Sequence, residues 1–122
     1  MSLQDVIDEN LLGPVLTALR RGNARRSEPI EITCVGDEED LPLGARDPDL
    51  LRWAEEHGFV LVSCDVTTMP VHHRVHLEAG RHSPGVFLIE LPCSIPRVVD
   101  ALLYYAEHSG EGFWRDSIVY IP

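Results

Sequence analysis

The chain has 122 residues, which suits one folded domain and is too short for two full-sized ones, so we expect residues 1–122 to form a single domain. Its 20 acidic residues against 10 basic ones give a formal net charge of −10, which argues against broad, sequence-independent binding of nucleic acids. Every basic residue is an arginine, and the absence of lysine excludes Schiff-base chemistry and the lysine of phosphate-binding loops.

Apolar runs that suit buried strands alternate along the chain with segments of helical period. The runs cover residues 3–8, 30–35, 59–64, 85–90 and 117–121. After the first run, an apolar stripe from Leu11 to Leu19 predicts a helix. We expect this helix to stop at Gly22, because two arginines and then a glycine end the stripe.

The next helix should begin with Asp47 as its N-cap and Pro48 in its first turn, and should stop at Gly58. Further helices are expected after Pro70 and from Ile95 to His108. Strands that alternate with helices imply right-handed crossovers and a mainly parallel sheet that is covered on both faces. The predicted fold is therefore an α/β three-layer αβα sandwich.

Acidic side chains follow three of the predicted strands. Asp8 follows the first strand, Asp47 opens the helix reached from the second, and Asp65 follows the third. Parallel strands end at one edge of a sheet, so these carboxylates should lie together, where they would bind Mg²⁺ or Mn²⁺. Second-rank ligand candidates are Glu9, Asp49 and Thr67. Each main acid also has a structural explanation, since Asp47 and Asp65 can cap helices and Asp8 can close a turn.

Three segments carry a resemblance to a known family: Asp8-Glu9-Asn10-Leu11, residues 47–54 (DPDLLRWA) and residues 60–65 (VLVSCD). In this order and spacing they resemble the small PIN-like proteins of the DUF5615 type, and the similarity extends over nearly the whole chain. PIN domains are metal-dependent ribonucleases and often toxins of toxin–antitoxin pairs. The resemblance implies a PIN-like fold, RNA cleavage with Mg²⁺ or Mn²⁺, an antitoxin protein as partner, and catalytic roles for Asp8, Asp47 and Asp65.

One position departs from the family pattern. Members often carry another aspartate two residues after the one that follows the third strand, where this chain has Thr67. A hydroxyl is a poorer cation ligand than a carboxylate. Two functions from different classes therefore stand: a PIN-like endoribonuclease, favoured by the acids, and a catalytically weakened domain that binds a protein, favoured by Thr67.

Other residues invite different sites. Asp65 also resembles the phosphate-accepting aspartate of a response-regulator receiver domain, but that site needs a lysine and the chain has none. His72 and His76 have the spacing of a zinc pair, yet the glutamate of the catalytic zinc motif is missing. We therefore expect His72, His73 and His76 to lie on a solvated helix face.

The basic cluster of the sequence consists of Arg20, Arg21, Arg25 and Arg26, which could contact an RNA backbone. A helix C-terminus followed by an exposed loop explains these arginines better. The acidic run at residues 37–40 is expected to be a solvated loop that could also receive arginines of a partner.

The compartment is inferred from what the sequence lacks. Cys34, Cys64 and Cys93 are odd in number and far apart, so we expect buried, reduced thiols. No apolar run is long enough for a membrane span, and the N-terminus does not have the pattern of a secretion signal. We expect a cytoplasmic protein without a membrane partner, and a homodimer is considered beside the RNA and antitoxin partners.

Overall fold

Strands and helices alternate along the chain in the computed structural model, which describes residues 3–11, 13–110 and 112–121. The strands are β1 (Asp5–Ile7), β2 (Ile32–Cys34), β3 (Val60–Ser63), β4 (Val86–Ile89) and β5 (Ile118–Ile121). The helices are the short 3-10 helix η1 (Glu9–Leu11) and the α-helices α1 (Pro14–Ala24), α2 (Asp47–His57), α3 (Met69–Glu78) and α4 (Ile95–His108). Each strand lies inside the apolar run that predicted it.

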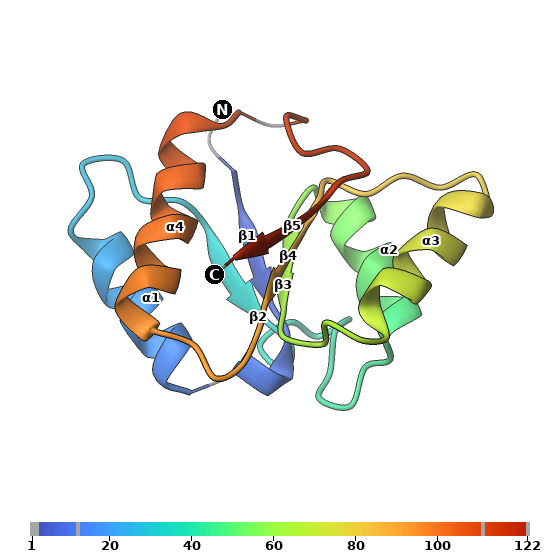
Figure 1. Cartoon of the computed structure of the whole chain (residues 1–122), viewed down its shortest axis with the longest axis horizontal. Helices are drawn as coiled ribbons and strands as arrows, with labels where there is room; N and C mark the ends of the chain where they lie inside the picture. The colour runs from blue at the N-terminus through green and yellow to red at the C-terminus, as the bar shows by residue number, and fades with distance from the viewer. Residues whose placement is uncertain (1–2, 12, 111, 122) are drawn as a thin grey trace.

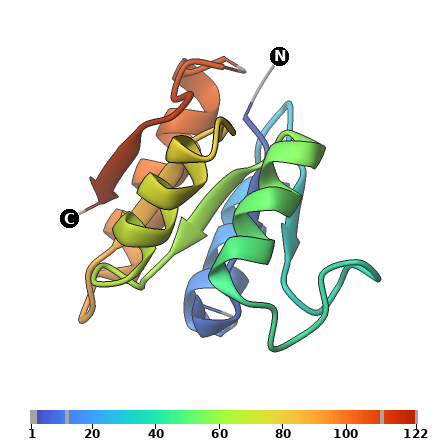
Figure 2. The same cartoon turned by 90° about the vertical axis from the view of Figure 1, so that its right-hand side faces the viewer.

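The sheet is entirely parallel, with the strand order β2-β1-β3-β4-β5. Helices α1 and α4 cover one face, and α2 and α3 cover the other (Figures 1 and 2). The predicted three-layer αβα sandwich is therefore confirmed. In the part of the chain that the structure describes, no helix combines the length and apolar character needed to cross a membrane.

Two hydrophobic layers hold the helices to the sheet. Successive strand residues point to opposite faces, so Val6 of β1 packs with α2 and α3, whereas Ile7 packs with α1 and α4. Strands β3 and β4 are buried along their whole length. Strands that are covered on both faces consist of continuous apolar residues, which is why these strands could be predicted from the sequence.

The four crossovers do not share one hand. Helix α1 connects β1 to β2 in one direction along the sheet, whereas α2 and α3 connect in the opposite direction and lie on the opposite face. Helix α4 connects β4 to β5 in the same direction as α2 and α3, yet it packs beside α1. The last crossover is therefore opposite in hand to the other three, and the expectation that all crossovers are right-handed is wrong.

Helix α1 continues two residues past Gly22, so the predicted stop at this glycine is wrong. A Cβ atom built at Gly22 would lie 2.9 Å from Leu103 Cδ1 and 3.4 Å from Val99 Cγ1 of α4. The glycine therefore serves the close approach of two helices. The predicted stop of α2 is confirmed, because Gly58 adopts the left-handed conformation with φ of 76° directly after His57.

We call the edge of the sheet where the strands end the carboxyl edge, and the other the amino edge. The segment after β1 leads to α1 on one face of the sheet, and the segment after the neighbouring strand β3 leads to α3 on the other face. In doubly wound sheets, ligands bind at such a switch point, outside the carboxyl ends of the strands. Here the switch point lies between β1 and β3, the strands that Asp8 and Asp65 follow.

Candidate functional site

Asp8 is the most deeply placed of the three predicted acids. Its backbone N–H donates to the Val62 carbonyl at 2.9 Å, and its Oδ2 accepts a hydrogen bond from Ser63 Oγ at 2.9 Å. Burial raises the pKa of Asp8 above its ordinary value, while the Ser63 hydrogen bond opposes that rise. Asp8 thus combines a fixed position with an increased affinity for a proton.

Ser63, the last residue of β3, joins two acidic segments. Its Oγ donates to Asp8 and also accepts from the backbone N–H of Asp65 at 3.1 Å, and its side chain is fully buried. Sequence reasoning missed this residue. The available signal was a single hydroxyl residue near the end of an apolar run, directly before Cys64 and Asp65.

Asp65 closes the turn that leads into α3. Its carboxylate accepts hydrogen bonds from the Thr68 backbone N–H at 2.9 Å and from the Thr68 hydroxyl. These two bonds, the hydroxyl bond first, lower the pKa of Asp65 and keep its carboxylate ionised. Asp65 therefore has a structural role in this turn, but Thr68 rather than Asp65 occupies the N-cap position of α3. Thr68 is a second residue that sequence reasoning missed.

Asp47 is the first residue of α2, and Arg46 rather than Asp47 occupies the N-cap position. The Asp47 carboxyl group lies within hydrogen-bonding reach of Asp65, and its Oδ2 lies 3.8 Å from His72 Nε2. Burial raises the pKa of Asp47, the charges of Asp8 and Asp65 raise it further, and His72 opposes the rise. The structure thus brings Asp8, Asp47 and Asp65 together at the carboxyl edge.

The second-rank candidates have other surroundings. Glu9 Oε1 accepts a hydrogen bond from the Gly44 backbone N–H at 2.9 Å and so ties the β2–α2 loop to η1. Asp49 lies 3.8 Å from Arg52 on the exposed side of α2. Thr67 is exposed and contributes a backbone hydrogen bond to Asp65. The charge of Glu9 thus acts on Asp8, and Thr67 adjoins Asp65, whereas Asp49 has Arg52 as its partner on the outer side of the helix.

The donor set determines which cation would fit. Asp47 and Asp65 can approach each other only with a shared proton or a cation between them, and carboxylate oxygens suit Mg²⁺ and Mn²⁺. Across residues 3–11, 13–110 and 112–121, no group of three or more His, Cys, Asp or Glu side chains is placed to hold one ion together. Mg²⁺ commonly binds one or two carboxylates and keeps several waters, so the arrangement fits an ion held by Asp47 and Asp65.

Two of the three histidines of α3 are buried, so the predicted solvated face is wrong for them. His73 Nε2 lies 2.8 Å from Ser83 Oγ, and burial lowers the pKa of His73. His76 Nε2 lies 2.8 Å from the His82 carbonyl oxygen and 3.3 Å from Glu55 Oε1. These partners satisfy the Nε2 atom of each ring, which allows the inner side of α3 to bury polar residues.

The four clustered arginines do not form one basic surface. Arg20 lies beside Asp37 of the β2–α2 loop, with 3.4 Å between Nη2 and Oδ2. Arg21 lies in the last turn of α1, and Arg25 and Arg26 follow that helix toward the amino edge. The charge of Arg26 acts there on Asp5. Of the four, Arg20 is therefore the one that pairs with an acid of the β2–α2 loop.

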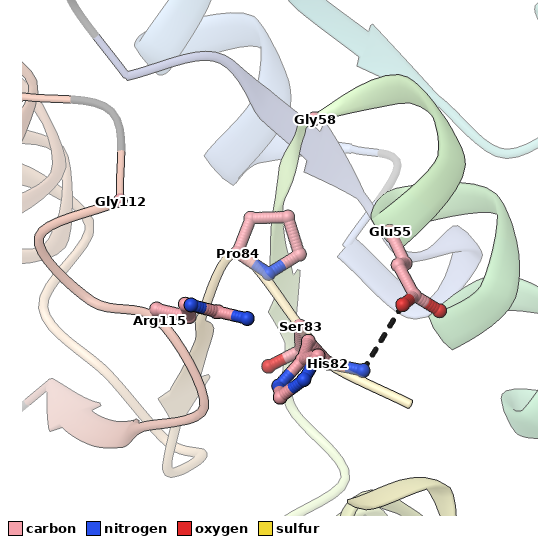
Figure 3. Close-up of a pocket in the computed structure, with 7 residues that line it drawn as sticks. All are labelled: Glu55, Gly58, His82, Ser83, Pro84, Gly112 and Arg115. Carbon is pink, nitrogen blue, oxygen red and sulfur yellow. Dashed lines mark hydrogen bonds between the residues drawn. The ribbon is translucent and has the colours of Figure 1, made fainter. Parts of the chain in front are cut away.

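A small cavity of about 210 Å³ lies at the amino edge, away from these acids (Figure 3). Glu55 accepts hydrogen bonds there from the His82 backbone N–H at 3.0 Å and from Arg81 Nε at 2.8 Å. His82 Nδ1 lies 2.8 Å from Asp116 Oδ2. The pairs that Glu55 and His82 form thus join α2, the α3–β4 loop and the segment that precedes β5.

Ser63→Ala should lower the free energy of unfolding by about 1–2 kcal/mol, because it leaves the buried Asp8 carboxylate without its donor. The loss should be larger at pH 8 than at pH 5, since the Ser63 bond favours the ionised carboxylate. Chemical denaturation at both pH values measures it. Ser117→Ala is the control, because the Ser117 hydroxyl makes an exposed bond of 3.3 Å to the Arg115 carbonyl. Equal losses in both variants would contradict the role given to Ser63.

Models of known protein families, curated proteins and solved structures give no match to the chain. The function proposed next therefore depends on the carboxylates, their surroundings and the resemblance of the motifs.

Proposed function

We propose that the chain is a metal-dependent endoribonuclease of the PIN-like type, with Asp8, Asp47 and Asp65 as its catalytic residues. The observation that carries the proposal is the meeting of three carboxylates from distant segments at the switch point of the sheet. Burial and mutual repulsion raise the pKa of two of them, a pattern typical of functional sites. The RNA substrate comes from the motif resemblance.

Each acid has a distinct role in this proposal. Asp47 and Asp65 would hold the Mg²⁺ or Mn²⁺ ion, which supplies Lewis-acid stabilisation of the phosphodiester. Asp8 lies behind them, fixed by Ser63. Its increased proton affinity suits it to accept a proton from the attacking water. His72 Nε2, 3.8 Å from Asp47 Oδ2, acts on that carboxylate through its charge and not through a hydrogen bond.

A second function is favoured by the state of Asp65. Both of its carboxylate oxygens already accept hydrogen bonds from Thr68, and Thr67 supplies a hydroxyl where the family often has a carboxylate. A weakened ion site would leave the acidic group free to receive cationic side chains of a protein partner such as an antitoxin. The second candidate is therefore a protein-binding domain without nuclease activity.

Thr67→Asp separates the two functions, because it adds a carboxylate beside the acids. For the wild type we expect one bound Mn²⁺ by calorimetry, feeble cleavage of single-stranded RNA in Mg²⁺ and faster cleavage in Mn²⁺, which binds nitrogen and oxygen ligands more tightly. Thr67→Asp should increase both the Mn²⁺ affinity and the cleavage rate by about tenfold, as one more ligand would.

EDTA should abolish cleavage by both forms. If neither form cleaves RNA in Mg²⁺ or Mn²⁺, the enzyme proposal is wrong and the protein-binding function takes its place. If the wild type cleaves vigorously in Mg²⁺ and Thr67→Asp adds nothing, the weakening ascribed to Thr67 is wrong while the enzyme proposal stands.

A further inference from the structure

A cavity of about 600 Å³ lies at the carboxyl edge, between α1 and the loop that leads from β2 to α2. Its walls combine the apolar side chains of Leu16, Val35 and Leu43 with the polar or charged side chains of Thr17, Arg20 and Asp37. The volume falls within the range of about 300–1,000 Å³ that is typical of small-molecule sites, which also combine apolar walls with a few polar groups. The cavity therefore has the size and lining of a ligand site.

The cavity adjoins the acidic residues through two shared segments. One wall follows β1 and η1, and so continues the segment that holds Asp8. The other wall is the loop after β2, which ends at Asp47. The hydrogen bond from the Gly44 N–H to Glu9 Oε1, at 2.9 Å, holds the two segments together. The cavity and the carboxylates are therefore built on the same two segments of the carboxyl edge.

Arg20 gives the cavity a cation that can be redirected. Its guanidinium lies 3.4 Å from the Asp37 carboxylate, and the two side chains are 45% and 60% exposed. Exposed ion pairs of this kind contribute little to stability, so Arg20 can turn toward an anionic ligand at small cost. Because the chain has a net charge of −10, an anion should bind only where a cation such as Arg20 offsets the repulsion.

Leu43 supplies the apolar counterpart. It is 65% exposed, and it packs over Gly36, where a built Cβ atom would lie 2.9 Å from Leu43 Cδ2. The glycine thus lets the leucine lie flat against the loop backbone and present its outer face to the cavity. An apolar face next to a cation suits a nucleobase with its attached phosphate, because the flat face of the base can pack on leucine while the phosphate pairs with the guanidinium.

We propose that this cavity binds one nucleoside of a single-stranded RNA, next to the phosphodiester that the acids cut. The inference rests on the proposed function and adds the subsite that would position the strand. The base lies against Leu16 and Leu43, and a neighbouring phosphate pairs with Arg20. Thr17 and the backbone of the β2–α2 loop offer hydrogen bonds to the sugar and base edges.

The test is the binding of a fluorescent single-stranded RNA oligonucleotide to the full chain in EDTA, followed by anisotropy. Leu43→Asp should weaken binding by about tenfold, because it removes one base contact and adds a repelling charge. The matched control is Leu91→Asp, which adds the same charge at another leucine beyond the carboxyl end of the sheet, 52% exposed and outside this cavity. It should weaken binding by no more than about twofold.

Arg20→Gln supplies a second variant, which should weaken binding and reduce its dependence on salt. Equal losses for Leu43→Asp and Leu91→Asp would overturn the inference, as would binding that neither variant changes or an absence of RNA binding. Because EDTA removes the metal, this result is independent of catalysis. If RNA binding depends on Leu43 but no cleavage occurs in Mn²⁺, the nuclease proposal is wrong and the binding subsite stands. If Leu43→Asp cleaves RNA as fast as the wild type does, the subsite is wrong and the nuclease proposal stands.

Discussion

Asp47→Asn is expected to stabilise the metal-free protein by on the order of 1 kcal/mol while it lowers RNA cleavage by about 100-fold or more. The stabilisation follows because burial and the charges of Asp8 and Asp65 raise the pKa of Asp47, so an uncharged amide relieves repulsion. The loss of cleavage follows because the amide is a weaker ligand for the proposed ion. Activity and stability should therefore change in opposite directions.

The stabilisation by Asp47→Asn should depend on pH. The pKa of Asp47 is higher in the folded chain than in the unfolded chain, so its ionisation opposes folding. The advantage of Asp47→Asn should be complete at high pH and should shrink as the pH falls and the wild-type carboxyl group is protonated. Denaturation at several pH values, without metal, measures it.

Asp49→Asn is the matched control on the same helix. Asp49 is exposed and lies beside Arg52, so its substitution should change neither cleavage nor the dependence of stability on pH. If Asp47→Asn destabilises the protein at pH 8, the inference that the three acids repel one another in the folded protein is wrong. If it cleaves RNA as well as the wild type does, Asp47 is not a catalytic ligand.

The second large effect concerns Asp5, which begins β1 at the end of the strand opposite to Asp8. Its side chain is 1% exposed, and within the described residues neither carboxylate oxygen has a hydrogen-bond partner. Burial raises the pKa of Asp5 to about 7, and the charge of Arg26 opposes the rise. The neutral acid is therefore the form that suits the fold.

Asp5→Asn should remove a component of stability that depends on pH. In the wild type this component is complete below about pH 4, where both states are protonated, and is lost as the pH rises toward 7. Relative to the wild type, the stability of Asp5→Asn should increase by roughly 4 kcal/mol between pH 4 and pH 8.

Urea denaturation across this pH range measures the difference, and Asp100→Asn on the exposed side of α4 is the control. The control should follow the wild type at every pH. Parallel pH profiles for the wild type and Asp5→Asn would show that Asp5 is ionised in the folded protein, and would contradict the burial argument.

The strands and the meeting of the acids could be predicted because they follow from patterns within single segments. An apolar run bounded by turn residues is enough to locate a buried parallel strand. Once the strands are parallel, Asp8 and Asp65 must share one edge of the sheet, whatever the sequence between them. These inferences need no knowledge of which helix packs on which.

The remaining features depend on contacts between distant segments. From the sequence alone, Gly22 indicates the end of a helix. Only the position of Leu103 of α4 shows that the glycine allows two helices to approach each other. From the sequence alone, His73 is expected in solvent, and only the fold shows that Ser83 lies beside its ring nitrogen. Ser63 and Thr68 position two acids by hydrogen bonds that no spacing rule predicts.

The hand of the last crossover also determines when the protein can finish folding. Strands β1 and β3, which carry Asp8 and Asp65, have one face covered by α2 and α3, but α4 must cover much of the other. At synthesis rates of about 5–20 residues per second, Ile7 and Val62 lack the cover of α4 on that face for seconds after Asp65 has been made. On the ribosome, the acidic residues are therefore present early, and their rigid arrangement waits for the last third of the chain.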